Sequence, residues 1–372
     1  LGDVYKRQDV MFIEYEENGK VLAAVPELVK IRESIEPLFI QPFEVKSMDM
    51  VINMEDLKPY SPAERELYEL PALNIPLVSQ DKLFTAHFSN DAMLSMDYYY
   101  TNGIRFDYID PNLARSPFTG LMLPYRKNAV VYHGISLVQD FYTPIKLDDT
   151  TVQFGDRPFA GVLYAGQFKV TLNPKKHYKQ VSELDFGIIG PESLGGFVQT
   201  TVHETKPTGW VNQVKNDVVV NYNIQIEKGI VNSGHFDLNG VFEGKLGTLH
   251  TNAGAGFFSR VGSFMPYFNN IGLIGPGKNG YSGKSKLQYA FTFSSMVRAI
   301  IYDATLQGGL FSKTNIYTLD PEDINRLVFN ASFGVEFSYK FFGFRTEMHY
   351  LTPEFKGSRE HRWLHMAATF CF

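Results

Sequence analysis

Apolar and polar residues alternate with a period of two along most of the chain from Phe84 onward. In 327–340, apolar residues stand at odd positions from Leu327 to Tyr339, with mostly polar residues between them. Successive side chains of a β-strand point to opposite faces, so this pattern predicts antiparallel strands with one apolar and one polar face. The same alternation occurs in 217–227, 235–246, 286–300 and 341–350.

The alternating segments are long for a soluble protein and indicate a membrane barrel. Segments of about 10–14 residues, an even strand count and a charged polar face favour an outer-membrane β-barrel whose apolar face meets lipid. The last strand ends on the C-terminal Phe372, which resembles the assembly signal of bacterial outer-membrane barrels. A soluble β-sandwich would give the same alternation and stays open as an alternative. We predict 12 strands, at 84–91, 98–109, 130–142, 158–172, 181–190, 217–228, 234–246, 249–260, 286–302, 326–340, 341–352 and 361–372.

The connections between these strands test the barrel topology. With the first strand rising, the connections on the outer rim should be long and those on the periplasmic rim short. Six connections fit, and three do not: 110–129 and 261–285 are long on the periplasmic side, and 247–248 is short on the outer side. A misplaced strand between 230 and 286 would explain two of these exceptions.

The first part of the chain differs from the rest in amino-acid composition. Residues 11–80 are acidic, rich in proline and poor in glycine, and two short helices are predicted there, over 25–31 and after the capping box Ser61–Glu64. We therefore expect an irregular or helical N-terminal extension over 1–82, periplasmic and of unknown role, followed by the barrel over 83–372. The chain opens without Met and without a signal-peptide pattern, and we expect its export signal to be missing from this sequence.

Composition narrows the class of protein. The 372 residues include 31 Phe, 21 Tyr and 31 Gly, which suits strands, and no apolar run is long enough for a transmembrane helix. Lys and Arg (35) nearly balance Asp and Glu (40), which argues against a nucleic-acid partner. The single cysteine, Cys371, excludes a disulfide framework and a cysteine-based metal site.

Polar residues gather at the strand ends that share the outer rim in this topology. A His with a nearby carboxylate can act as a general base, and carboxylate and other oxygens suit calcium, which takes 6–8 oxygen ligands. The serine-hydrolase elbow and the zinc-protease motif are both missing. Each residue also has an ordinary alternative: His203 as a hydrogen-bonded loop residue, Asn90-Asp91 as a turn, and Asp156-Arg157 as an ion pair in the lumen.

The order of these pieces resembles the outer-membrane lipid A 3'-O-deacylase family. The matching pieces lie within 84–213 and are Asn90-Asp91, Tyr100–Gly103, Gln139–Pro144, Asp156–Gly161, Gly187–Pro191, Gln199, His203 and Trp210. The resemblance implies a 12-stranded barrel in the outer membrane of a Gram-negative cell. It also implies a calcium-dependent esterase that removes the 3'-linked acyloxyacyl chain from lipid A of lipopolysaccharide.

The resemblance also assigns roles to individual residues. His203 would be the general base that activates water, with Gln199 beside it, and Asn90, Asp91 and Thr101 would shape the calcium and oxyanion region. Lys146 and Glu204 stand near the places of the family's site lysine and site glutamate, and the segment from His203 to Trp210 is short. We expect a monomer with a plugged lumen, to which the lipid comes laterally. A non-enzymatic barrel, either a small porin or an adhesion protein, is the alternative.

Overall fold

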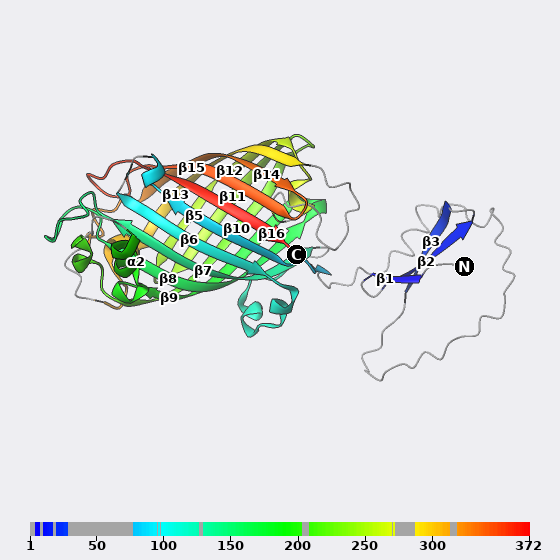
Figure 1. Ribbon diagram of the computed structural model, residues 1–372, viewed down its shortest axis with the longest axis horizontal. Coiled ribbons are helices and arrows are strands. Elements are labelled where there is room, and N and C mark those ends of the chain that lie inside the picture. Colours follow the sequence, from blue (N-terminus) through cyan, green and yellow to red (C-terminus); the bar gives the residue numbers. More distant parts are fainter. Residues whose placement is uncertain are drawn as a thin grey trace. The chain divides into compact units, whose positions relative to one another are not determined.

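The computed structural model divides the chain into two units, Leu1–Tyr68 and Glu69–Phe372 (Figure 1). It describes residues 77–372 except 95, 97, 126–128, 203–207, 270, 272–286 and 313–317, and within the first 28 residues it describes three strands. Among the described residues, no helix has the length and apolar character needed to cross a bilayer.

The described part of the first unit is a small antiparallel sheet. Its strands are β1 (Val4–Arg7), β2 (Val10–Glu17) and β3 (Lys20–Leu28), in that order. The helix predicted over 25–31 is therefore wrong for residues 25–28, where Pro26 pairs with Phe12 of β2. Proline is tolerated here because β3 is an edge strand of this sheet. The second predicted helix, after Ser61, lies outside the described residues.

The second unit is a closed barrel of 12 antiparallel strands, which confirms the predicted fold. The sheet runs from β7 through β6, β5 and β16 down to β8, and β7 pairs with β8 to close it, while the short β4 (Leu77–Val78) lies parallel to β7. The predicted strand limits differ from the observed ones by at most four residues. The strands are β5 (Leu83–Asn90), β6 (Tyr99–Ile109), β7 (Val130–Thr143), β8 (Ala160–Asn173), β9 (Tyr178–Ile189), β10 (Asp217–Asn232), β11 (Phe236–Gly247), β12 (His250–Ser263), β13 (Gln288–Asp303), β14 (Leu327–Tyr339), β15 (Phe342–Leu351) and β16 (His361–Cys371).

The wall of the barrel has its apolar face outside and its polar face inside. In β14, Phe333 is 56% exposed and the preceding Ser332 is 4% exposed, as the alternation predicts. Inside, ion pairs cross between strands, such as Arg105 with Glu183 at 2.9 Å. A closed wall with this polarity suits a membrane, because lipid offers no partner for backbone or side-chain polar groups.

The two ends of the barrel differ. One end, which we call the site rim, carries α2 (Gly195–Val202), and the other, the terminal rim, carries the C-terminus (Figure 1). The three exceptions to the loop-length rule remain, because β11 and β12 lie close to their predicted positions, and among the described residues between 230 and 286 no strand is misplaced. The long connection 110–129 instead contains two 3-10 helices, η3 (Pro111–Arg115) and η4 (Pro117–Leu121).

Side chains of the described residues reach into the lumen near both ends of the barrel. At the terminal rim, the Arg260 guanidinium lies 3.8 Å from the ring centre of Phe264 and 5.0 Å from that of Tyr267, whose hydroxyl accepts from Lys179 Nζ at 3.2 Å. At the site rim, a buried apolar cluster is formed by Tyr99, Leu306, Leu319, Ile324 and Phe355. The lumen is thus occupied by side chains at both ends.

Because the outer face of the wall meets lipid, an arginine placed on it should lower the stability of the barrel. Phe293, near the middle of β13, is exposed on that face, and Phe293→Arg should lower the free energy of unfolding by about 2–4 kcal/mol in lipid vesicles. Urea titration of folded protein measures this. The control is Phe154→Arg in the connection between β7 and β8, which should change stability by less than about 0.5 kcal/mol. Equal effects of the two substitutions would contradict a lipid-facing wall.

Candidate functional site

Polar side chains interrupt the apolar outer wall where β5, β6 and β7 reach the site rim. Asn90 lies opposite Asn102, and its Nδ2 donates to the Thr101 carbonyl at 3.2 Å. The Thr101 hydroxyl is 2.9 Å from that of Thr143 on β7. Asn90 is two residues beyond the exposed Phe88 in the same strand, so it shares the outward face. The structure thus brings Asn90 and Thr101 together, with Thr143 of the predicted piece Gln139–Pro144 as their partner.

Asp91 lies at the start of the connection between β5 and β6 and is fully buried. Its Oδ2 accepts from the Tyr98 backbone N–H at 3.0 Å, and its carbonyl accepts from the Leu94 N–H at 2.8 Å. These contacts fold the connection around the carboxylate, beside the neighbouring Asn90. The Asp91 carboxylate thus follows the Asn90 amide along the chain, and Thr101 lies beside Asn90 across the β5–β6 ladder.

Helix α2 packs against the outside of the wall at β7 and β8. Its Val198 packs against Phe141 of β7 and Trp210, whose ring centres lie 6.2 Å apart. Ahead of the helix, the Ser193 carbonyl accepts from Gln139 Nε2 of β7 at 2.7 Å. The helix carries Gln199, which is buried. A site between the wall and α2 therefore faces the membrane side of the barrel and not its lumen.

Two glycines allow α2 to come this close. A Cβ on Gly161 of β8 would lie 2.3 Å from Ser193 Oγ and 3.2 Å from Gly195 Cα. That hydroxyl is itself held, because it donates to the Gly190 carbonyl at 2.6 Å. A Cβ on Gly195 would lie 3.1 Å from atoms of Phe141 and of Gly161. Any side chain at position 161 or 195 would thus push the helix away from the wall.

Of the remaining predicted site residues Lys146, His203 and Glu204, the structure describes Lys146. Lys146 is exposed, and its side chain makes no hydrogen bond or ion pair with any residue of the described chain; only its backbone pairs with Gln153. His203 and Glu204 lie outside the described residues. His203 follows directly on Val202, the last residue of α2. Its role as general base, and those of Lys146 and Glu204, stay predictions.

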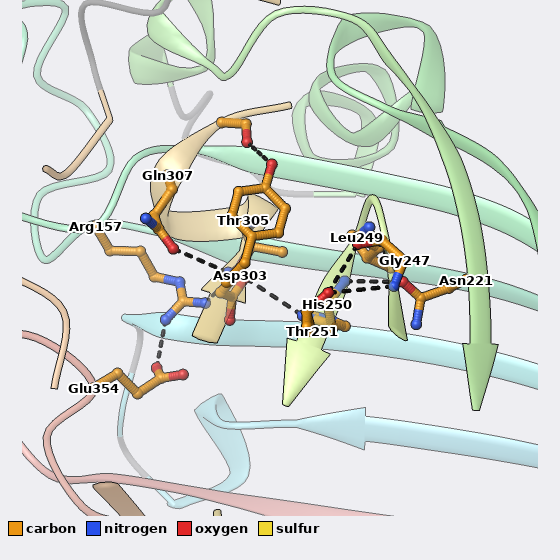
Figure 2. A network of polar contacts seen from close by, with 12 residues as sticks. Arg157, Asn221, Gly247, Leu249, His250, Thr251, Asp303, Thr305, Gln307 and Glu354 are labelled. Atoms are coloured by element: carbon orange, nitrogen blue, oxygen red, sulfur yellow. Dashed lines mark hydrogen bonds and ion pairs between the residues drawn. The ribbon is translucent and has the colours of Figure 1, made fainter. Parts of the chain in front are cut away.

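A buried ion pair ties the rim connections together across the mouth. Figure 2 shows Arg157 reaching Glu354, with Asp303 and Thr305 close by. The Arg157 guanidinium also donates to Thr305 Oγ1 at 2.7 Å, and burial raises the pKa of the Glu354 carboxyl although Arg157 lies against it. The predicted ion pair of Asp156 with Arg157 is wrong, because within the described chain the Asp156 carboxylate accepts from the backbone N–H groups of Ile145 and Arg157 and forms no ion pair with the Arg157 guanidinium.

A cavity of about 400 Å³ lies in the lumen behind this ion pair. Tyr100 and Arg157 line it, whereas Asn90, Asp91, Thr101 and Gln199 do not. Its walls carry charges of both signs, and Trp363 is stacked between His349 and His361. The cavity is therefore separated by the barrel wall from the site beside α2. Its charged and histidine residues are Arg157, Lys245, His250, Arg298, Asp303, Glu347, His349, Glu354 and His365.

No cluster of three or more His, Cys, Asp or Glu in the described chain is placed to hold a metal ion. The candidate calcium set contributes one carboxylate, from Asp91, and otherwise the side-chain oxygens of Asn90 and Thr101. These donors are all oxygen atoms of the hard type that calcium prefers. The set fits a calcium ion in chemistry, with further ligands supplied by other oxygens.

The comparisons with known proteins bear on this geometry. The family model of the outer membrane protein LpxR matches residues 67–371. The chain belongs to the LpxR family. The solved structure of LpxR from Salmonella typhimurium is 21% identical, with a TM-score of 0.62, and the match covers 78% of this chain and all of that one. The β-domain of the Bordetella autotransporter BrkA is 10% identical, with a TM-score of 0.40, over 79% of this chain and 99% of that one. No protein with a curated description matches the chain.

Membership of the LpxR family places the protein in the outer membrane of a Gram-negative cell. The soluble β-sandwich is therefore wrong. The same strands that alternate in sequence form a closed wall, and the family model spans that whole wall. The outer face of β5–β7 and α2 accordingly lies on the lipid side of an LpxR-family barrel.

The close approach of α2 can be tested through Trp210. Gly161→Val should displace the helix, because overfilling such a contact costs about 1–3 kcal/mol. Trp210, buried between Phe141 and Phe159, should then show red-shifted emission and stronger acrylamide quenching. The control is Gly240→Val, where a Cβ would meet nothing closer than Ile230 Cδ1 at 3.6 Å. Unchanged Trp210 emission in the folded Gly161→Val protein would refute the contact.

Proposed function

We propose that this LpxR-family barrel is a calcium-dependent lipid A 3'-O-deacylase. The observation that carries the proposal is the site on the outer wall, between β5–β7 and α2, because a membrane lipid can reach that place without leaving the bilayer. The substrate would be lipid A of lipopolysaccharide in the outer leaflet. The reaction would hydrolyse the ester that links the 3' acyloxyacyl chain.

The polar groups of the site supply what ester hydrolysis needs. His203 would accept a proton from water, whose oxygen attacks the ester carbonyl carbon. The carbon–oxygen bond of the ester then breaks, and the same proton passes to the leaving alkoxide, which gives a fatty acid and a free hydroxyl. Gln199, carried into the buried side of α2, would orient the water beside His203.

The wall residues would hold the carbonyl end of the ester. Asn90 and Thr101 lie within one hydrogen-bonded group at the top of β5 and β6, so their positions are fixed before substrate arrives. Donors fixed in this way stabilise a developing oxyanion without reorganising during the reaction. Asp91, with Asn90 and Thr101, would hold calcium, which when bound supplies positive charge next to the ester carbonyl.

The structure offers little support for a porin. At the terminal rim, Arg260, Phe264 and Tyr267 of the described chain pack against one another in the lumen. At the site rim, Arg157 and Glu354 join connections that come from opposite parts of the sheet. Ions would have to pass these side chains at both ends of the lumen. A lipid substrate that enters from outside the wall does not have to pass them.

Mass spectrometry of lipid A from cells that express each variant tests the proposal. The wild-type protein should remove the 3' acyloxyacyl chain. Loss of the general base should lower the rate by about 10²–10⁴-fold in His203→Ala. Asp91→Asn, and addition of a calcium chelator to purified protein, should also suppress the loss of the chain.

The matched control is His235→Ala, which removes a histidine from the hairpin between β10 and β11 at the terminal rim, where its Nδ1 lies 2.9 Å from the Gly262 carbonyl. This variant should deacylate like the wild type. Full activity of His203→Ala would refute the general-base role, and full activity in chelator would refute the metal. Unmodified lipid A together with ion conductance of the wild type would favour a porin.

A further inference from the structure

The connection between β6 and β7 folds back over the outside of the barrel. We call residues 110–125 the wall-covering segment. Asp110 begins it by accepting from the Asn112 N–H at 2.8 Å and from Lys82 Nζ at 2.7 Å. The hydrogen bond from Lys82 lowers the pKa of Asp110 to about 2, so the carboxylate stays charged. Two short 3-10 helices, η3 and η4, follow this anchor.

The strands beneath this segment present polar side chains on their outward faces. Gln167 of β8 pairs in register with the exposed Ile135 of β7, so both point outward. Ser182 lies four residues from the exposed Phe186 in β9 and shares its face, as does Gln180. Left uncovered, these polar groups would meet acyl chains, which offer no hydrogen bonds.

The wall-covering segment satisfies these groups one by one. Gln167 accepts from Ser116 Oγ at 2.6 Å and donates to Thr119 Oγ1 at 3.2 Å. Ser182 Oγ accepts from the Leu123 N–H at 3.3 Å. Two further hydrogen bonds end on backbone carbonyls of the segment, from Gln180 Nε2 to Pro124 at 3.1 Å and from the Tyr222 hydroxyl to Leu121 at 3.1 Å.

From Pro117 to Tyr125, the exposed residues of the segment are apolar, whereas Asn112 and Arg115 are exposed nearer its start. Leu121 is 62% exposed, and Phe118 and Tyr125 are exposed as well. The ring of Phe118 lies 5.7 Å from that of Phe186, which belongs to the outer wall itself. The segment thus replaces a polar patch of the wall with an apolar one, and its apolar side chains continue the lipid-facing surface.

We propose that the wall-covering segment is a lipid-binding element that lies within the membrane leaflet nearest the terminal rim. Its occupant is the acyl-chain layer of that leaflet, against Phe118 and Leu121, with Tyr125 toward the headgroups, where tyrosine is enriched. Continuity with the lipid-facing wall through Phe186 carries this choice of partner. The proposal rests on the outer-membrane location and is independent of the proposed activity.

Spin labels on the full-length protein in phospholipid vesicles test it. In a Cys371→Ser background, labels are placed by Phe118→Cys, Leu121→Cys and Tyr125→Cys, and folding is checked by heat-modifiable gel mobility. Collisions with oxygen report lipid, and collisions with a water-soluble nickel chelate report water. Phe291→Cys on the wall is the lipid reference, and Lys356→Cys in a rim connection is the water reference.

The ratio of oxygen to nickel collisions at positions 118 and 121 should be several-fold higher than at 356 and should approach the ratio at 291. Position 125 should give an intermediate ratio. A ratio at 118 and 121 equal to that at 356 would place the segment in water and overturn the proposal. Protection from both reagents would show that protein covers this face and would overturn it as well. If Phe118→Cys fails to fold, Leu121→Cys alone decides.

Discussion

The hydrogen-bonded seam between the first and last barrel strands is the interaction on which the rest of the structure depends. β5 pairs with β16 from Leu83 with Cys371 to Asn90 with Leu364, so no strand edge is left open. In a bilayer, each unpaired backbone group would cost several kcal/mol, because lipid cannot replace the missing hydrogen bond. Closure also fixes which face of every strand meets lipid. That single constraint makes the outer face apolar and sends polar side chains inward.

Two described regions of the outer wall depart from this rule and carry polar side chains. A connection from the nearer rim lies at each of them. At the site rim, α2 lies against β7 and β8, next to the polar ends of β5 and β6, and the contact of Gly161 with Gly195 sets its distance from the wall. At the terminal rim, the wall-covering segment satisfies Gln167 and Ser182. One connection carries Gln199 and leads into His203, whereas the other turns Phe118, Leu121 and Tyr125 outward. This difference agrees with the two proposals, ester hydrolysis beside α2 and attachment to the lipid layer at the wall-covering segment.

Much of the barrel could be predicted from sequence. Each strand meets lipid on one face and the polar lumen on the other, so apolar and polar residues alternate along it. The strand limits follow from that alternation, as the run from Leu327 to Tyr339 shows. The helix predicted at Pro26 was wrong because an edge strand tolerates proline as well as a first helical turn does. The pairing of Arg157 with Glu354 was not predictable, since these residues lie in separate connections and meet only when the barrel closes. Asn90, Thr101 and the piece Gln139–Pro144 could be found through the family resemblance, but the contact of Thr101 with Thr143 depends on a register shift in β6 that the alternation does not show.

In the proposed function, lipid A binds on the outer wall beside α2 and not in the lumen. Photo-crosslinking distinguishes these two places, with a photoreactive residue in the His203→Ala background, which under the proposed mechanism is inactive and retains its substrate. The residue is placed at Asn102 on the wall of the site, at Phe329 on the outer wall of β14, or at Asn330 in the lumenal cavity. The account predicts a lipid A adduct at 102 in several-fold higher yield than at 329, and none at 330. An adduct at 330, or equal yields at 102 and 329, would contradict it.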